Sequence, residues 1–116
     1  MRLFQAYVTA ALWSSTDDDG TPLDSKYTSD DVAAETLDRM LQDCKQFAEQ
    51  HADLIEESEL TDEQVGHDFW LTRNRHGAGF WDRRLGEVGE RLTEAAHKFR
   101  EFDLYVGDDG LIYGSP

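Results

Sequence analysis

The chain has 116 residues, a length typical of one domain, so residues 1–116 are predicted to form a single domain around one hydrophobic core. Its one cysteine, Cys44, excludes an internal disulfide and favours a reducing compartment. No apolar run approaches the roughly 18 residues of a membrane-spanning helix, and the N-terminal stretch lacks the pattern of a signal peptide. We therefore expect a cytoplasmic protein that contacts no membrane.

The formal net charge is −14, and it is distributed unevenly along the chain. Residues 1–66 hold 16 acidic and 4 basic residues, a net charge of −12, whereas residues 67–116 hold 9 and 7, a net charge of −2. The first half is poorly suited to bind nucleic acid directly, because phosphate contacts need Lys and Arg. Dense carboxylates can instead imitate phosphates and occupy another protein's nucleic-acid groove. The alternative is that they only keep the chain in solution, as in a salt-tolerant or GC-rich source.

In chain order, the apolar residues of positions 3–13 recur at helical spacing and predict a first helix, with a strand as the alternative. Residues 14–27 have the Gly, Pro, Asp and Ser content of a loop. A second helix is predicted from a capping box at Thr28 and Asp31 to about residue 57, because its apolar side chains fall on one stripe. That stripe comprises Leu37, Met40, Leu41, Cys44, Phe47, Ala48, His51, Leu54 and Ile55.

Residues 67–82 alternate large apolar and polar side chains and are predicted to form a β-hairpin with His76 at its tip. Helical spacing returns over residues 83–101. Two short β-runs then flank an Asp-Asp-Gly sequence at residues 108–110, which is a strong hairpin signal. The predicted fold class is therefore α+β, with two to three helices packed with short antiparallel hairpins.

The segment GHDFWLTRNRHGAGFWDRR, residues 66–84, holds two of the three tryptophans and four of the eight arginines. Its glycines at 77 and 79 would allow positive φ or a close approach of the backbone. Its metal-ligand types match no zinc spacing, so neither a metal nor a cofactor is expected. The same side chains could form an acid–base pair, although no nucleophile or phosphate-loop motif accompanies them. These ligand types are His67, Asp68, His76 and Asp82.

The aromatic and cationic side chains of this segment are also typical of interface anchors. The aromatic residues are nevertheless large enough to be the core itself, and most of them are expected to pack. Arg75 and His76 are expected to protrude, because an unpaired buried charge is costly. The four aromatic residues concerned are Phe69, Trp70, Phe80 and Trp81.

The runs TAALWSSTDDDGTPLD, GHDFWLTRNRHGAGFWD and FDLYVGDDGLIYG resemble a family of short acidic bacteriophage proteins, and the resemblance covers nearly the whole chain. Arg75 stands where the family motif GHDFWLTRN-HGAGFWD would have a glycine, which makes this loop stiffer and more basic. The resemblance implies a phage origin and a place in the cytoplasm of the host cell. It supplies no activity and no catalytic residue, but small acidic phage proteins are often inhibitors of host defence.

Together these features predict a non-enzymatic phage protein that binds a host or phage protein. Its concrete form is a nucleic-acid-mimicking inhibitor of a host nucleic-acid-binding protein, of the anti-restriction or anti-CRISPR kind. The alternative is a small enzyme or ligand-binding domain centred on the predicted hairpin of residues 67–82. The predicted partner-binding residues are Asp17, Asp18, Asp19, Asp30, Asp31, Asp38, Glu56, Glu57, Arg73, Asn74, Arg75 and His76.

Overall fold

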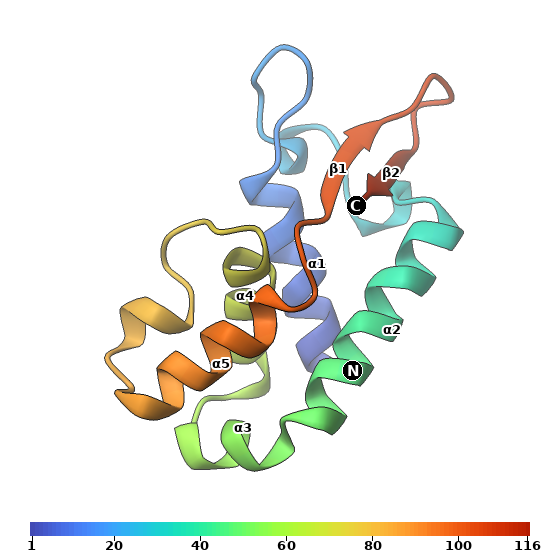
Figure 1. Ribbon diagram of the computed structural model, residues 1–116. Coiled ribbons are helices and arrows are strands. Elements are labelled where there is room, and N and C mark those ends of the chain that lie inside the picture. Colours follow the sequence, from blue (N-terminus) through green and yellow to red (C-terminus); the bar gives the residue numbers. More distant parts are fainter.

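The computed structural model describes residues 1–116 as a mostly helical fold with five α-helices and one two-stranded antiparallel sheet (Figure 1). The α-helices are α1 (Arg2–Ser14), α2 (Ala34–Gln50), α3 (Ala52–Ser58), α4 (Asp62–Arg73) and α5 (Glu87–His97). The strands are β1 (Asp103–Val106) and β2 (Ile112–Ser115), and three short 3₁₀ helices are η1 (Leu23–Ser25), η2 (Ser29–Asp31) and η3 (Phe80–Arg83). The α+β class holds in this coarse form, but the predicted number of two to three helices is wrong.

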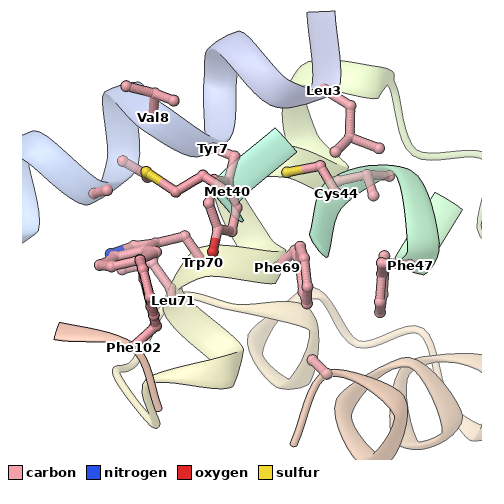
Figure 2. Packing of buried hydrophobic residues seen from close by; sticks show 14 of the residues in the cluster. Leu3, Tyr7, Val8, Met40, Cys44, Phe47, Phe69, Trp70, Leu71 and Phe102 are labelled. Carbon is pink, nitrogen blue, oxygen red and sulfur yellow. The ribbon is translucent and has the colours of Figure 1, made fainter. Parts of the chain in front are cut away.

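Helices α1 and α4 pack closely against each other at the centre of the molecule. Gly66 makes this approach possible, because a Cβ there would overlap the backbone oxygen of Leu3. The buried apolar side chains of α1, α2 and α4 meet in one continuous cluster (Figure 2). Within it the rings of Phe47 and Phe69 stack with centroids 4.2 Å apart, and the Tyr7 ring lies 5.3 Å from that of Phe69. The helix predicted for residues 3–13 is confirmed as α1.

The second predicted helix is divided into η2, α2 and α3. The capping box of Thr28 and Asp31 is present, but it closes the single turn of η2. Residues 32 and 33 then run beside β2, where the amide of Ala33 donates to the carbonyl of Ile112 at 2.9 Å, so α2 cannot begin before Ala34. This pairing is a contact with a strand 80 residues away, which helical periodicity cannot reveal.

The predicted apolar stripe is buried only in part. Met40, Cys44 and Phe47 lie in the core, whereas Leu41 is half-buried and lies outside the core cluster. The helix is interrupted at His51, whose φ of −123° and ψ of 26° separate α2 from α3. One non-helical residue leaves the spacing of apolar side chains almost unchanged, so the stripe continues across the break.

The β-hairpin predicted for residues 67–82 is wrong. A second capping box, made by Thr61 and Gln64, opens α4, and this helix continues through Arg73. All six residues from Asp68 to Arg73 are buried, so no polar face marks the helical period. The alternation of apolar and polar side chains imitated a strand because the polar residues are buried as well.

The C-terminal hairpin is confirmed. Strands β1 and β2 pair antiparallel with Asp103 opposite Ser115 and Val106 opposite Ile112. The turn between them is closed by a hydrogen bond from the Gly107 amide to the carbonyl of residue 111, at 2.8 Å. The helix predicted for residues 83–101 is shorter than expected, because η3 and a turn precede α5. None of the helices has the combination of length and apolar character needed to cross a membrane.

Candidate functional site

Arg73, which was predicted to lie on a recognition surface, is buried with 1% of its surface exposed. Its Nη1 donates to Asp43 Oδ2 at 2.8 Å and to the Tyr7 hydroxyl at 2.9 Å. Its Nε and Nη2 donate to the carbonyls of Arg100 and Phe99, each at 2.9 Å. The guanidinium thus joins α1, α2, α4 and the segment after α5. The prediction of Arg73 as a surface contact is wrong, since its donors all point into the core.

The buried centre beside Arg73 contains two potential nucleophiles, and both are held in their neutral forms. Burial is the main cause that raises the pKa of the Tyr7 phenol, against the opposing influence of Arg73. Burial likewise raises the pKa of the Cys44 thiol. At neutral pH neither group is ionised or open to solvent, so this centre serves packing rather than catalysis.

Asn74 is half-buried and connects α4 to the C-terminal hairpin. Its Nδ2 donates to the carbonyl of Trp70 at 3.0 Å, and its Oδ1 accepts from the amide of Phe102 at 2.8 Å. The side chain therefore closes the end of α4 and the approach to β1 at the same time. Its hydrogen-bonding groups are used within the chain, so Asn74 also has a structural role.

The acid–base pair anticipated for neighbouring His and Asp residues exists at His67 and Asp68. Asp68 is fully buried, and its Oδ1 lies 2.8 Å from His67 Nδ1. Its carboxylate also accepts hydrogen bonds from Nε and Nη2 of Arg83. The His67 ring stacks on Trp13, with centroids 5.9 Å apart. Both rings line an open groove of about 580 Å³ along α1. The one hydroxyl in that groove, on Thr9, donates to the helix backbone, so no nucleophile adjoins the pair.

Arg75 and His76 are exposed, as predicted, and both border a cavity of about 420 Å³. This cavity lies between the end of α4, the loop of residues 74–79, η3 and α5, and we call it the loop pocket. The side chains that give it chemical character are Arg75, His76, Trp81, Asp82, Thr93 and His97. Thr93 and His97 were missed in the sequence, because they reach the pocket only through the packing of α5.

Of the two roles predicted for the glycines of this loop, a close approach of the backbone is confirmed at Gly79, and positive φ is not found at either glycine. The positive φ values fall on Arg75, at 59°, and Ala78, at 66°, rather than on Gly77 or Gly79. Gly79 is instead required for close packing, since a Cβ there would overlap Thr72 Oγ1. Arg75 thus adopts the left-handed conformation that glycine takes without steric cost.

Of the four aromatic residues in segment 66–84, three are buried and one is exposed. Phe69, Trp70 and Phe80 are buried, as expected for most of the set, whereas Trp81 is 69% exposed. Trp81 lies on the rim of the loop pocket. Across the pocket, partial burial and then the charge of Arg75 lower the pKa of His97, so its ring is neutral at pH 7.

The eight predicted acidic residues lie on the surface but not in one patch. The loop that carries Asp17, Asp18 and Asp19 lies at one end of the molecule, and α3, which carries Glu56 and Glu57, lies at the other (Figure 1). The longest dimension of the molecule is 43 Å. The remaining three, Asp30, Asp31 and Asp38, lie in η2 and at the start of α2.

Two of these eight acids have a local structural role. Asp17 Oδ1 accepts from the amides of Asp19 and Thr21 at 2.9 Å, and the bond from Thr21 is the main cause that lowers the pKa of Asp17. Asp31 Oδ2 accepts from the amide of Thr28 at 2.8 Å. The carboxylates of the other six make no hydrogen bond or ion pair within the chain and face solvent.

Exposed carboxylates occur on the outward side of α2 and on α3. On α2, the positions 35, 38, 42, 46 and 49 fall on one arc, opposite the buried Met40, Cys44 and Phe47, and positions 42 and 46 of this arc are glutamines. Two exposed cations, Arg39 and Lys45, flank that arc. Three further exposed acids lie on α3, beyond the break at His51. We call this set the carboxylate row: Glu35, Asp38, Glu49, Asp53, Glu56 and Glu57.

The carboxylate row is not neutralised by the chain's own cations. Of the 25 acidic residues, five have a basic group within 4.0 Å, and none of the five belongs to the row. Those five are Asp17, Asp43, Asp68, Glu87 and Glu101. The row therefore keeps its full charge for an external partner or for solvent.

The four side chains considered as metal ligands do not converge. His67 pairs with Asp68, whereas Asp82 Oδ2 accepts from the amide of Ala78 and His76 faces the loop pocket. No group of three or more His, Cys, Asp or Glu side chains is placed to hold a metal ion. In comparisons with known proteins, the chain matches no family model, no curated protein and no solved structure.

Proposed function

We propose that this chain is a non-enzymatic, phage-encoded binding protein that acts in the cytoplasm of the host cell. Its carboxylate row occupies the cationic groove of a host nucleic-acid-binding protein and so inhibits a restriction or CRISPR system. The observation that carries the proposal is the unpaired, outward-facing row of Glu35, Asp38 and Glu49 on α2, continued by α3. Such a row offers a cationic groove a fixed set of negative charges without any nucleic acid.

The dimensions of the row suit this role. Helix α2 has 17 residues and is therefore about 25 Å long, at 1.5 Å per residue. One DNA strand places a phosphate about every 3.4 Å along the duplex axis, so α2 spans about seven phosphate positions, and its row supplies three carboxylates, Glu35, Asp38 and Glu49, over that length. The helix holds its carboxylates on a rigid scaffold, because its opposite face is anchored by Met40, Cys44 and Phe47. Rigid placement lowers the entropy lost on binding.

The chemistry elsewhere favours binding over catalysis. The potential nucleophiles Tyr7 and Cys44 are buried and neutral, and the His67–Asp68 pair has no hydroxyl or thiol nucleophile beside it. A binding protein needs none of these groups to react. The alternative of solvation predicts instead that the position of the carboxylates is unimportant, and this difference can be tested.

The test compares two variants that lose the same charge at different places. The row variant is Glu35→Gln, Asp38→Asn, Glu49→Gln and Asp53→Asn. The control variant neutralises four exposed acids of the other half of the chain: Glu90→Gln, Glu94→Gln, Asp103→Asn and Asp108→Asn. Each protein is added to DNA-cleavage assays with a panel of restriction endonucleases and CRISPR effector complexes.

We expect the natural protein to inhibit at least one enzyme of the panel, and the inhibition to weaken steeply between about 50 and 300 mM salt. The control variant should inhibit equally well, whereas the row variant should lose most of its inhibition. Equal inhibition by both variants, or no inhibition of any enzyme in the panel, contradicts the proposal. Melting curves of both variants exclude unfolding as the cause of a loss.

A further inference from the structure

The loop pocket is lined by one exposed arginine, Arg75, one carboxylate, Asp82, and two histidines, His76 and His97. Arg73 and Arg83, the neighbours of Arg75 in the sequence, are engaged elsewhere, with Asp43 and Asp68. Arg75 has a single ionic neighbour, Glu101, at 4.0 Å, and both side chains are about 60% exposed. Exposed pairs at this distance contribute at most about 1 kcal/mol. The guanidinium of Arg75 is therefore available to an anion that enters the pocket.

Trp81 provides an aromatic surface on the same pocket. Its neighbour Phe80 is completely buried, while 69% of Trp81 remains exposed. Trp81 therefore presents its indole ring to a ligand that enters the pocket. Aromatic rings stack on an indole face regardless of their substituents.

The loop that holds these groups is fixed before any ligand arrives. The amides of Arg75 and His76 donate to the carbonyls of Thr72 and Leu71, at 3.0 and 2.9 Å, and so wrap the loop around the end of α4. The left-handed φ of 59° at Arg75 is an unfavourable conformation for a residue with a side chain.

We propose that the loop pocket binds a small planar aromatic ligand that carries a phosphate, such as a nucleoside monophosphate. Its phosphate is held by Arg75 and His76, and its ring stacks on Trp81. Asp82, on the same rim, can accept a hydrogen bond from a ring amino group or a ribose hydroxyl. The cavity of about 420 Å³ falls within the usual range of small-molecule sites. This site is separate from the carboxylate row and does not depend on the function proposed for it.

The charge of the molecule favours a mononucleotide over a longer strand. One phosphate can be satisfied inside the loop pocket, where Arg75 lies. Further phosphates of a strand would extend onto a surface that holds most of the 25 acidic residues and would be repelled. A single-stranded oligonucleotide therefore serves as the contrasting ligand in the test.

The test measures binding to the full chain by isothermal titration calorimetry at low salt. The ligands are adenosine monophosphate, adenosine without its phosphate, inorganic phosphate, and an oligoadenylate of about ten nucleotides. The variants are Arg75→Gln and Trp81→Ala. Trp13→Ala is the matched control, because Trp13 is also an exposed tryptophan, at 42%, but lies on the α1 groove.

We expect adenosine monophosphate to bind more tightly than any of the other three ligands. Trp81→Ala should weaken its binding about fivefold or more, the lower end for the loss of one base stack. Arg75→Gln should weaken it about tenfold, while Trp13→Ala should leave it unchanged. The proposal is overturned if the monophosphate does not bind, if adenosine binds as tightly, if the oligonucleotide binds more tightly, or if Trp13→Ala has the larger effect.

Discussion

Arg73 and Arg75 are two residues apart and have opposite environments. Arg73 is 1% exposed, with three of its nitrogens bonded to Asp43, Tyr7 and two carbonyls. The side chain of Arg75 is 62% exposed and faces only Glu101, at 4.0 Å. Helix α4 ends at Arg73, and the left-handed step at Arg75 then turns the chain away from the core. The same residue type thus holds the framework at one position and remains available to a ligand at the other.

The comparison shows why the type of secondary structure had to be known before any function could be assigned. The predicted hairpin had Arg73 on its first strand and Arg75 in the following loop, and both were assigned to one recognition patch. In the structure Arg73 is the last residue of a buried helix, and Arg75 lies beyond its end. The predicted patch therefore combined a core residue and a surface residue.

Among the substitutions that test this difference between Arg73 and Arg75, the largest loss of stability is expected at Arg73. The change Arg73→Ala should lower the free energy of unfolding by about 3–5 kcal/mol, because it leaves Asp43 buried without its main partner. Urea melts of the variant and the natural protein measure this loss. Arg73→Met, which keeps most of the apolar stem but none of the charge, should also be strongly destabilising for the same reason. A loss below about 1 kcal/mol in both variants would show that the buried network is unimportant.

A smaller loss is expected from Gly79, which lies against Thr72 between the two regions. Gly79→Val should cost about 1–3 kcal/mol, the range for overpacking, because its Cβ would overlap the Thr72 hydroxyl that accepts from the Phe80 amide. Gly77→Ala is the control, since a Cβ at Gly77 has no neighbour closer than 3.9 Å. Thermal melts should separate the two variants clearly. Equal melting temperatures would contradict the close packing at Gly79.

The sequence predicted the parts of this fold that depend on local signals. The stripe at positions 4, 7, 8, 11 and 12 located α1, and the Asp-Asp-Gly turn located the C-terminal hairpin. The capping box at Thr28 was real, although the turn it caps is short. These signals act over a few residues, so one sequence was sufficient to find them.

The errors came from residues whose environment is set by distant contacts. The second half of α4, residues 68–73, is buried all round because it packs against α1, α5 and η3, so it has no polar face to identify it as a helix. Helix α2 begins later in the chain than predicted because Ala33 pairs with Ile112. For the candidate sites, the exposure of Arg75 and His76 followed from the cost of burying charge. The contributions of Thr93 and His97 to the loop pocket required the position of α5.

The stability of the protein should depend on pH partly through His97 of the loop pocket. Partial burial and the charge of Arg75 lower the pKa of His97 below its usual value of about 6.5. The unfolded chain therefore takes up this proton at a higher pH than the folded chain, and the contribution of His97 to stability is lost as pH falls from about 6.5. Urea melts at pH 7.5 and 5.5 should show a smaller loss for His97→Gln than for the natural protein. Both proteins carry the same 25 carboxylates, so the difference between their losses of stability reports His97 alone. Equal losses of stability in the two proteins would show that His97 is not involved.

The smallest effect is expected at the loop tip. The double change Arg75→Ala, His76→Ala should alter the free energy of unfolding by no more than about 0.5 kcal/mol, as is usual for exposed positions. The pair of Arg75 with Glu101 is exposed on both sides, so its loss removes little. Alanine, like arginine, has a Cβ, so the double variant leaves the strain of the left-handed step unchanged. Urea melts should therefore place this variant close to the natural protein and far from Arg73→Ala. A loss comparable to that of Arg73→Ala would mean that the loop tip belongs to the framework, and the preorganised loop pocket would lose its physical basis.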